Sequence, residues 1–560
     1  MPDYSAYTFL IATVKRGFFD GFNPPVAIGS VVSISAITLW ILVFPEQSTA
    51  VLAEAKAYLL TGFRGWFLYS VAAFLVAAAF IAIAPISGTL RLAKTKSARP
   101  SFSTASWLSM MFCGGIGAGI VAYAVAEPMS HLATNPELIS GAMQPGAQAA
   151  AQTAVKYAFL HWGLSAWAIY SIMGLAIGLF SFRYGLPLTI RTIVAPLLGR
   201  RLEGVIGHLI DSFAIVAIVA GVATTMGYGS KTLSSGVNYL AGGSLLADAP
   251  NHVPALLIAL IACAILAAVA VIAGVGRGMK WISNTGTTLF FVVLVYFGLH
   301  ASPEFLVATG FGALSDYITQ LPSLSLSVFG ETKTETDIAL STWQTDWTIF
   351  YWTWWLAFAP FVSLFIARIS EGRTVREFVL GSALAPCGVC FAWFAATGSA
   401  SIGLELASEE SLLLGRDTTE QLFVAISLLN GSFVGEIFTV LAFVLIFILA
   451  SATFASGVLA ITTIAAAGDN SQKPAKHIIL WVVVCAAIIG ALLAAGGTAS
   501  IRDVMVISAL PISGLMVLAV LSIGWVLFTE TRYAAKEKAH LAGVEQREPN
   551  TEAATVRVSD

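Results

Sequence analysis

Twelve runs of about 20 mostly apolar residues, separated by more polar connections, dominate the hydrophobic pattern of the chain. A helix of that length crosses the roughly 30 Å of hydrocarbon in a bilayer. The runs lack the alternation of barrel strands, so they predict membrane-spanning α-helices. They cover residues 24–45, 66–86, 104–126, 157–181, 206–229, 253–274, 283–301, 347–367, 379–401, 434–460, 478–496 and 504–528.

The same pattern divides the chain into six predicted regions. They are a cytoplasmic tail over 1–23, two peripheral helices over 24–86, a first five-helix repeat over 104–301, an amphipathic surface region over 302–346, a second five-helix repeat over 347–528 and a cytoplasmic tail over 529–560. Residues 402–433 also have helical spacing of apolar positions and predict a second amphipathic helix on the outer surface.

Basic residues are distributed unequally between the two sets of connections. With the N-terminus inside, 22 of the 29 Lys and Arg residues fall on the inner side. Cytoplasmic connections of membrane proteins are enriched in Lys and Arg. We therefore expect both termini in the cytoplasm and a multi-pass protein of the plasma membrane, the bacterial inner membrane.

The composition excludes several classes of protein. Hydrophobic residues make up 57% of the chain and charged residues 11%, with a mean hydropathy of +0.84. Soluble domains carry about 25% charged residues. A net charge of −2 provides no basic field for nucleic acid. The spans hold almost no paired acids, Ser/His pairs or His/Glu metal motifs, so we expect a non-enzyme surrounded by membrane lipid.

Two of the predicted spans contain residues that disturb a helix. The third holds four glycines within CGGIGAGI, and glycine in a helix interior costs about 1 kcal/mol relative to alanine. They are Gly114, Gly115, Gly117 and Gly119. Pro360 lies in the middle of the eighth span, where it kinks the helix. Close packing through small residues is one explanation of the glycines. The more specific explanation is an unwound segment facing a solute cavity, with Gly117, Gly119 and Pro360 as hinges.

These two spans lie five apart in the order of the chain. Two five-helix blocks that each begin with an interrupted helix fit a transporter built from inverted repeats.

Aromatic residues sharpen this interpretation. Six of them fall near the middle of spans four and eight, where Trp and Tyr are less common than at the membrane interface. They are Trp162, Trp167, Tyr170, Trp354, Trp355 and Phe358. Packing explains any single one, but together they predict a box around a cation, because aromatic faces attract quaternary ammonium groups.

Several stretches resemble the betaine/choline/carnitine transporter family, over most of residues 15–530. The family's third helix is similar to MMFCGGIGAGIVAYAVAEPMSHL, and its fourth helix to FLHWGLSAWAIYSIMGL. Its eighth helix and following basic loop are similar to WTIFYWTWWLAFAPFVSLFIARISEGRTVREF, and the entry to its seventh helix to GVGRGMKWISN. The resemblance implies a homotrimer of twelve-helix protomers, inverted repeats like those of amino-acid/sodium symporters, and alternating access.

The resemblance also implies roles for individual residues. The family's aromatic substrate cage corresponds to Trp162, Trp167, Tyr170 and Trp355, and Trp354 to a residue near the inner release path. Phe358 stands where the family usually has a tryptophan. A solute carboxylate would meet the backbone amides near Gly114 and Gly115.

The resemblance is weaker at the family's sodium positions. Two threonines of its fifth helix correspond to Ile218 and Val222, which offer no hydroxyl, although the neighbouring Phe361 is retained. A second site corresponds to the carbonyls of Cys113 and Ile116 with Phe447, Ala450 and Ser451. Thr224 and Thr225 are candidate substitutes for the missing hydroxyls.

We therefore expect sodium coupling to be reduced or absent, which leaves proton symport, solute exchange or a single-sodium mechanism. Candidate proton-binding residues are Asp211, Glu127 and His161. The sequence predicts a secondary active importer of a small quaternary-ammonium or sulfonium compound without a bound cofactor. A sodium-independent exchanger or proton symporter for carnitine-like or methylamine solutes is the alternative, and a solute-binding receptor belongs to a different class.

Overall fold

The computed structural model describes residues 7–95, 97–115, 117–144, 148–246, 248–330, 334–431 and 433–545. Within these ranges the chain is almost entirely helical, and its one β-bridge joins Arg91 to Thr374. The spanning elements are α1 (Pro24–Val43), α2 (Pro45–Ile83), α3 (Thr104–Gly115), α4 (Gly119–Ala133), α6 (Gln148–Trp162), α7 (Leu164–Gly178), α9 (Val205–Leu240), α10 (Val253–Ile272), α11 (Lys280–His300), α14 (Phe350–Arg368), α15 (Val375–Leu406), α17 (Phe433–Ala465) and α18 (Ala475–Glu545).

Other elements connect them. They are η2 (Pro85–Gly88), α5 (Pro136–Ile139), η3 (Leu179–Arg183), η4 (Ile190–Val194), α8 (Ala195–Leu198), η5 (Gly199–Glu203), η6 (Val275–Met279), α12 (Pro303–Leu326), α13 (Glu335–Gln344), η7 (Thr345–Ile349) and α16 (Gln421–Leu429).

The predicted all-α membrane architecture is confirmed. Among the described residues, ten helical segments are each long and apolar enough to cross a membrane. One of them, α18, contains two spans that meet at Gly497. The φ of Gly497 is 63°, a left-handed conformation that is sterically unfavourable for residues with a Cβ and therefore favours glycine. The third predicted span is divided between α3 and α4, each too short to be counted by length. Twelve crossings result.

Contacts between the helices have the pattern of a two-fold relation between the two five-helix blocks. Helices in corresponding positions contact each other, namely α7 with α15, α9 with α17 and α10 with α18. Contacts between other pairs of helices also occur twice. In the first block α7 contacts α14 of the second block, and in the second block α15 contacts α4 of the first. Likewise, α10 of the first block contacts α17 of the second, and α18 of the second contacts α9 of the first. Internally repeated transporters are built in this way, with solute sites between the repeats.

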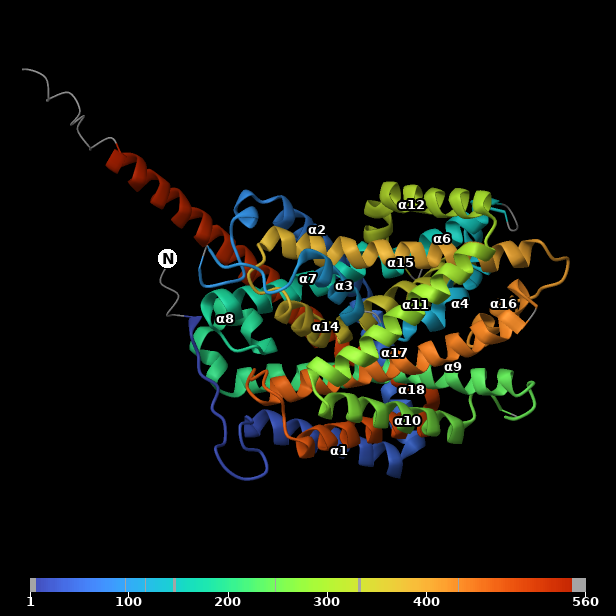
Figure 1. The fold of residues 1–560 in the computed structure, drawn as a ribbon, viewed down its shortest axis with the longest axis horizontal. Coiled ribbons are helices and arrows are strands. Elements are labelled where there is room, and N and C mark those ends of the chain that lie inside the picture. The colour runs from blue at the N-terminus through green and yellow to red at the C-terminus, as the bar shows by residue number, and fades with distance from the viewer. Residues whose placement is uncertain are drawn as a thin grey trace, which may run out of the picture.

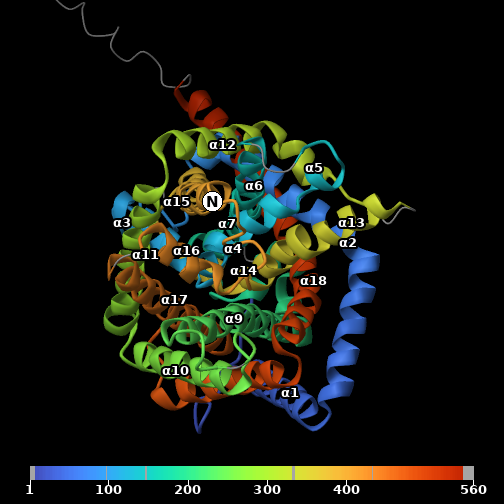
Figure 2. The same ribbon diagram turned by 90° about the vertical axis from the view of Figure 1, so that its right-hand side faces the viewer.

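The two ends of the bundle differ in the elements that they carry. Figure 1 shows the N-terminal segment and the C-terminal part of α18 at the same end as α8, with α12 and α16 at the opposite end. In Figure 2 the view runs along the bundle, and α4, α7 and α14 lie near its centre while α1 and α2 lie at its edge.

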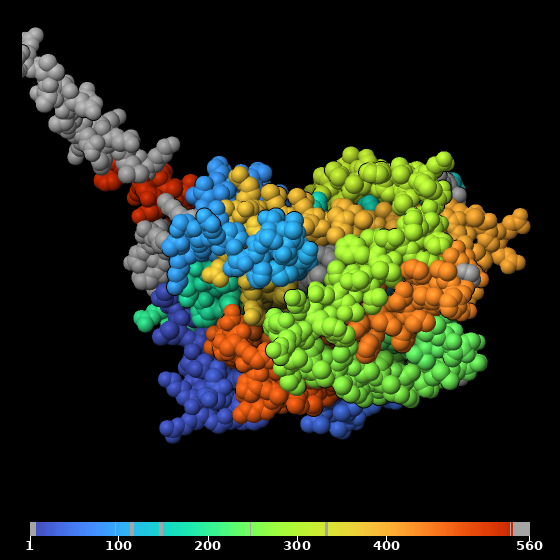
Figure 3. Space-filling view, viewed as in Figure 1, coloured from blue at the N-terminus to red at the C-terminus, as the bar shows by residue number. Residues whose placement is uncertain are grey.

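The surface of the bundle is apolar where lipid would surround it. On α10, Ile258, Ile261, Ile265 and Val269 are all exposed. This helix and its neighbours α11 and α17 lie on the face drawn in Figure 3. Exposed aliphatic side chains at this density are unfavourable in water but suit a hydrocarbon solvent.

Two expectations about the secondary structure are wrong. The helix over 402–433 does not lie on the surface: α16 is short, and six of its nine residues are buried because QLFVAISLL is apolar on nearly every side. The second helix begins at Pro45 rather than at residue 66, because the residues before its apolar run include good helix formers such as Ala, Leu, Glu and Lys.

Candidate aromatic solute site

The site begins with a helix break that the sequence did not predict. Helix α6 ends at Trp162 and α7 starts at Leu164, with Gly163 between them at φ −94° and ψ −145°. A Cβ on Gly163 would lie 2.3 Å from the carbonyl oxygen of Phe159, so only glycine fits. The break leaves backbone carbonyls of the last turn of α6 without helical donors.

Two indole N–H groups bind those carbonyls. Nε1 of Trp355 donates to the oxygen of His161 over 2.9 Å, and Nε1 of Trp167 donates to the oxygen of Trp162 over 3.2 Å. A buried indole whose N–H is bonded at its edge has a fixed orientation, and its apolar face remains for contact with other groups. The break in α6–α7 therefore orients the predicted cage.

Four predicted cage residues form a continuous ring cluster. Ring centroids of Trp162 and Trp355 lie 4.9 Å apart at 69°, those of Trp355 and Tyr170 6.3 Å apart at 80°, and those of Tyr170 and Trp167 5.5 Å apart at 79°. Successive rings stand nearly perpendicular to each other, as the walls of a box do. All four are buried, with at most 5% of each exposed.

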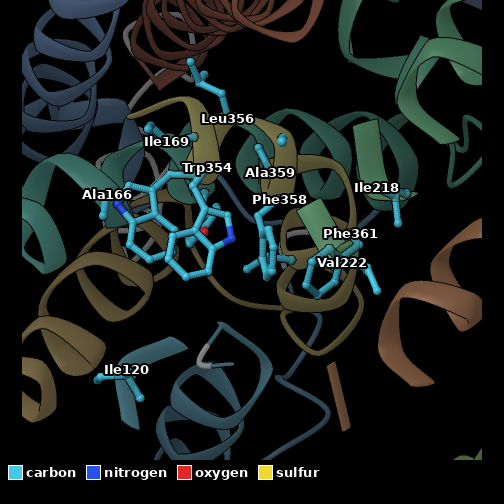
Figure 4. Packing of buried hydrophobic residues seen from close by; sticks show 14 of the residues in the cluster. Ile120, Ala166, Ile169, Ile218, Val222, Trp354, Leu356, Phe358, Ala359 and Phe361 are labelled. Carbon is cyan, nitrogen blue, oxygen red and sulfur yellow. The ribbon is translucent and has the colours of Figure 1, made fainter. Parts of the chain in front are cut away.

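The other two predicted aromatic residues lie beside this cluster. Trp354 stacks on Trp355, with ring centroids 5.2 Å apart and an angle of 8° between the ring planes. The ring of Trp354 has room because residue 119 is a glycine; a Cβ at Gly119 would lie 2.4 Å from it. Phe358 contacts Trp354 at 6.1 Å and Phe361 at 4.7 Å. Figure 4 shows Trp354, Phe358 and Phe361 within one packed region of α14.

Two buried polar atoms of the cluster have no hydrogen-bond partner among the described residues. They are the hydroxyl oxygen of Tyr170 and Nε1 of Trp354. Buried polar groups are normally satisfied by protein, water or ligand, so these atoms are candidates to meet a polar group of a bound solute.

A buried carboxylate supports the box from behind. Glu127 accepts hydrogen bonds at Oε2 from Nε1 of Trp162 over 2.7 Å and from the hydroxyl of Tyr351 over 2.5 Å. Its Oε1 lies 2.7 Å from Nδ1 of His161 and 3.4 Å from Nε2 of His131. These donors satisfy the carboxylate without an ion, so we assign no metal to this group of one acid and two histidines.

A second candidate proton site has a different environment. Asp211 is fully buried and accepts from Nε of Arg191 over 2.7 Å and from the backbone N–H of Arg191 over 2.9 Å. Asp211 is thus held in an ion pair that joins α9 to the η4 turn.

The glycine-rich break lies where the sequence predicts it. Helix α3 contains Cys113 and ends with Gly114 and Gly115, Ile116 lies outside the described residues, and α4 begins at Gly119. A Cβ on Gly117 would lie 3.0 Å from Oγ1 of Thr453 and 3.6 Å from Oγ1 of Thr225.

The eighth span is not interrupted at its proline. Helix α14 continues through Pro360, and the irregular turn is the π-helical η7 just before α14. A proline removes only one backbone hydrogen bond, which packing on both sides offsets in this buried helix.

The predicted sodium positions are filled mainly by apolar packing. A Cβ on Gly457 of α17 would lie 2.6 Å from Cγ2 of Val222 and 3.7 Å from Cγ2 of Ile218. Figure 4 shows both side chains with Phe361 in the packed core. Sodium prefers oxygen ligands, so these residue types do not fit a sodium ion.

The second predicted sodium position keeps one hydroxyl. Ser451 donates it to the carbonyl of Phe447 over 2.8 Å, within α17. Of the two threonines considered as substitutes, Thr224 donates to the carbonyl of Ala220, whereas the hydroxyl of Thr225 is buried and has no partner among the described residues.

A buried aromatic cluster between the two halves of a helical membrane bundle is typical of a membrane transporter rather than of a soluble binding module. The chain belongs to the BCCT (betaine/carnitine/choline) family of transporters, whose profile matches residues 25–532.

Curated relatives are similar along most of their length. The glycine betaine transporter OpuD of Bacillus subtilis is 33% identical over 512 residues, 90% of this chain and 94% of the relative. The osmo-independent choline transporter BetT1 of Acinetobacter baylyi is 32% identical over 92% of this chain and 95% of the relative. A solved Na⁺-coupled sialic acid symporter overlaps 81% of this chain and 86% of that chain at a TM-score of 0.37 and 13% identity, too low to compare residues.

The sequence did not predict the break at Gly163 or the hydrogen bond that Trp162 of the cage donates to Glu127. The available signals were a glycine between His161-Trp162 and Leu164, and an acidic residue directly after the apolar run 104–126. Intramembrane acids are rare and usually functional.

Proposed function

We propose that the chain is a secondary active importer of a small quaternary-ammonium or sulfonium compound, in the class of glycine betaine, choline, carnitine and dimethylsulfoniopropionate. The observation that carries this proposal is the box of near-perpendicular rings of Trp162, Trp167, Tyr170 and Trp355. Cation–π attraction of about 2 kcal/mol or more per desolvated ring favours a methylated onium group over a neutral solute. The names of the relatives agree with this class.

Transport would follow from the position of the box between the two halves of the bundle. Rocking of one half against the other would expose the same site to each side in turn. The carboxylate of a betaine would bind the unpartnered hydroxyl of Tyr170. The amides of Gly114 and Gly115 do not suit this role, because both residues lie at the C-terminal end of α3, where N–H groups bond within the helix and the carbonyls are free. We further propose a location in the plasma membrane with both termini in the cytoplasm, supported by the distribution of basic residues. The homotrimer that we also propose rests on membership of the family.

We propose that import does not require sodium, because Ile218 and Val222 offer no hydroxyl to an ion. Solute exchange or coupling to protons would then drive accumulation.

The test is uptake of labelled glycine betaine and choline into proteoliposomes. An imposed sodium gradient is compared with sodium-free buffer under a proton gradient, and preloading with unlabelled solute separates exchange from symport. We expect uptake of at least one solute. Binding of the solutes with no flux would support a receptor instead, and absence of both binding and flux would contradict the proposed substrate class.

A further inference from the structure

Glu127 is buried in the membrane-spanning core without a permanent positive charge beside it. Its side chain is 0% exposed, and among the described residues its ion-pair partners are only His131 and His161. The titratable groups that face it are His131 and Tyr123 from its own helix, His161 from α6 and Tyr351 from α14. Its net charge therefore depends on protons rather than on a fixed cation, unlike that of Asp211 beside Arg191.

A polar path connects this carboxylate to one end of the bundle. Nε2 of His161 lies 3.2 Å from the hydroxyl of Thr348, on the opposite side of the imidazole from Glu127. Thr348 lines a pocket of about 280 Å³ that also touches Glu137 and the exposed Ser323 and Ser327. The pocket lies among α5, α12 and α13, at the end that the basic residues predict to be outside.

The other end of the path is the aromatic box. Oε2 of Glu127 binds the indole N–H of Trp162, and the backbone carbonyl of His161 binds the indole N–H of Trp355. A change of charge at Glu127 therefore acts directly on Trp162 through one hydrogen bond. It reaches Trp355 only through His161, whose ring lies against Glu127 and whose backbone carbonyl accepts from Trp355.

We propose that Glu127 and His161 form a proton-binding site whose occupancy is coupled to binding of the cation in the aromatic box. The coupled ligand rests on the proposed function above, whereas the proton site itself rests on the geometry alone.

The proton step involves both residues. In the protonated state, Oε1–H of Glu127 donates to Nδ1 of His161, and Nε2–H of the neutral imidazole donates to Thr348. Release begins with transfer of the Oε1 proton to Nδ1, which gives an imidazolium. The imidazolium then loses its Nε2 proton through Thr348 to water in the pocket. One proton leaves, and an ionised Glu127 remains beside a neutral His161.

The sign of the coupling follows from Coulomb attraction. An ionised Glu127 attracts a cation in the adjacent box, and protonation removes that attraction. Affinity should therefore rise as the pH rises through the titration of the site. Choline carries a net positive charge and should respond more than glycine betaine, whose own carboxylate opposes the effect.

The experiment measures the dissociation constants of choline and glycine betaine from about pH 5 to about pH 8 in detergent-purified full-length protein. We expect choline affinity to rise about tenfold and glycine betaine affinity about threefold. In Glu127→Gln, whose amide oxygen still accepts from Trp162 and Tyr351, affinity should stay at the acid value at every pH. Infrared difference spectra between the two pH values, without solute, should contain a carboxylic-acid carbonyl band that Glu127→Gln lacks.

The matched control is Glu405→Gln. Glu405 is also a buried carboxylate, but it accepts from the backbone of Leu412 and Leu413 at the far end of α15. This control should keep the wild-type pH dependence. The proposal is overturned if affinity does not change with pH, or if Glu127→Gln retains the change and the infrared band. If the wild type binds neither solute, the proposed function fails, and the infrared measurement still decides whether Glu127 titrates.

Discussion

The aromatic box and the region of the predicted sodium ligands lie close together, but they differ in the groups that they offer to a ligand. In the box, the indoles of Trp162, Trp167 and Trp355 each donate to a defined acceptor, so their orientation is fixed. At the predicted sodium ligands, Val222 and Ile218 pack against the backbone of α17 at Gly457. One region is an organised polar and aromatic site, and the other is an apolar helix contact.

This difference is the basis of our proposal that solute recognition and ion coupling are separable in this chain. A quaternary ammonium needs only faces of aromatic rings and a support that holds them. A sodium ion needs several oxygens at once, and the side chains of Ile218 and Val222 offer it none. The box can therefore persist while the source of energy changes.

Loss of one wall of the box should have the largest effect. Trp355→Leu removes a ring worth about 2 kcal/mol or more and leaves the carbonyl of His161 without its donor, so apparent affinity for the solute should fall at least about 30-fold. Isothermal titration with choline and glycine betaine measures this. An unchanged affinity would show that Trp355 does not contact the solute and that the binding site lies elsewhere.

The control for this substitution is Trp281→Leu. Trp281 is 58% exposed on the surface of α11, so the same chemical change there should leave affinity unchanged.

Restoring hydroxyls in the apolar region should have a smaller but specific effect. In Ile218→Thr/Val222→Thr, each hydroxyl has a carbonyl one turn away to bind, as Thr224 binds Ala220, so the helix should tolerate both changes. We expect sodium to stimulate uptake about fivefold in this variant and less than about twofold in the wild type. The measurement is proteoliposome uptake with sodium replaced by potassium.

Ile218→Ala/Val222→Ala opens the same space without adding oxygen, so it should remain insensitive to sodium. Cooperative stimulation of the wild type by sodium would contradict the comparison on which the double substitution is based.

The sequence predicted the elements whose cause is local. Apolar length specified the twelve crossings, and the glycines of CGGIGAGI predicted the break between α3 and α4. The same reasoning predicted an interruption of the helix at Pro360, and this was wrong because helix packing on both sides keeps α14 continuous.

The support behind the box was not predictable in the same way. Glu127 contacts His161 and Tyr351, which are 34 and 224 residues away, and no periodicity links such distant positions. The break at Gly163 depends equally on three-dimensional context, because one glycine in an apolar span is usually tolerated within the helix.

The smallest expected effect concerns the hydroxyl that remains in the second predicted sodium position. Ser451 donates to the carbonyl of Phe447 one turn earlier, a bond that serine and threonine commonly make inside helices without any ion. Ser451→Ala removes the hydroxyl and leaves the helix backbone intact, so uptake rate and its response to sodium should change less than about twofold. Initial rates in proteoliposomes with and without sodium measure both quantities. If Ser451→Ala instead removed a sodium-dependent component of uptake, an ion would have to bind at Ser451 itself, and the contrast between an intact box and a degraded ion site would no longer hold.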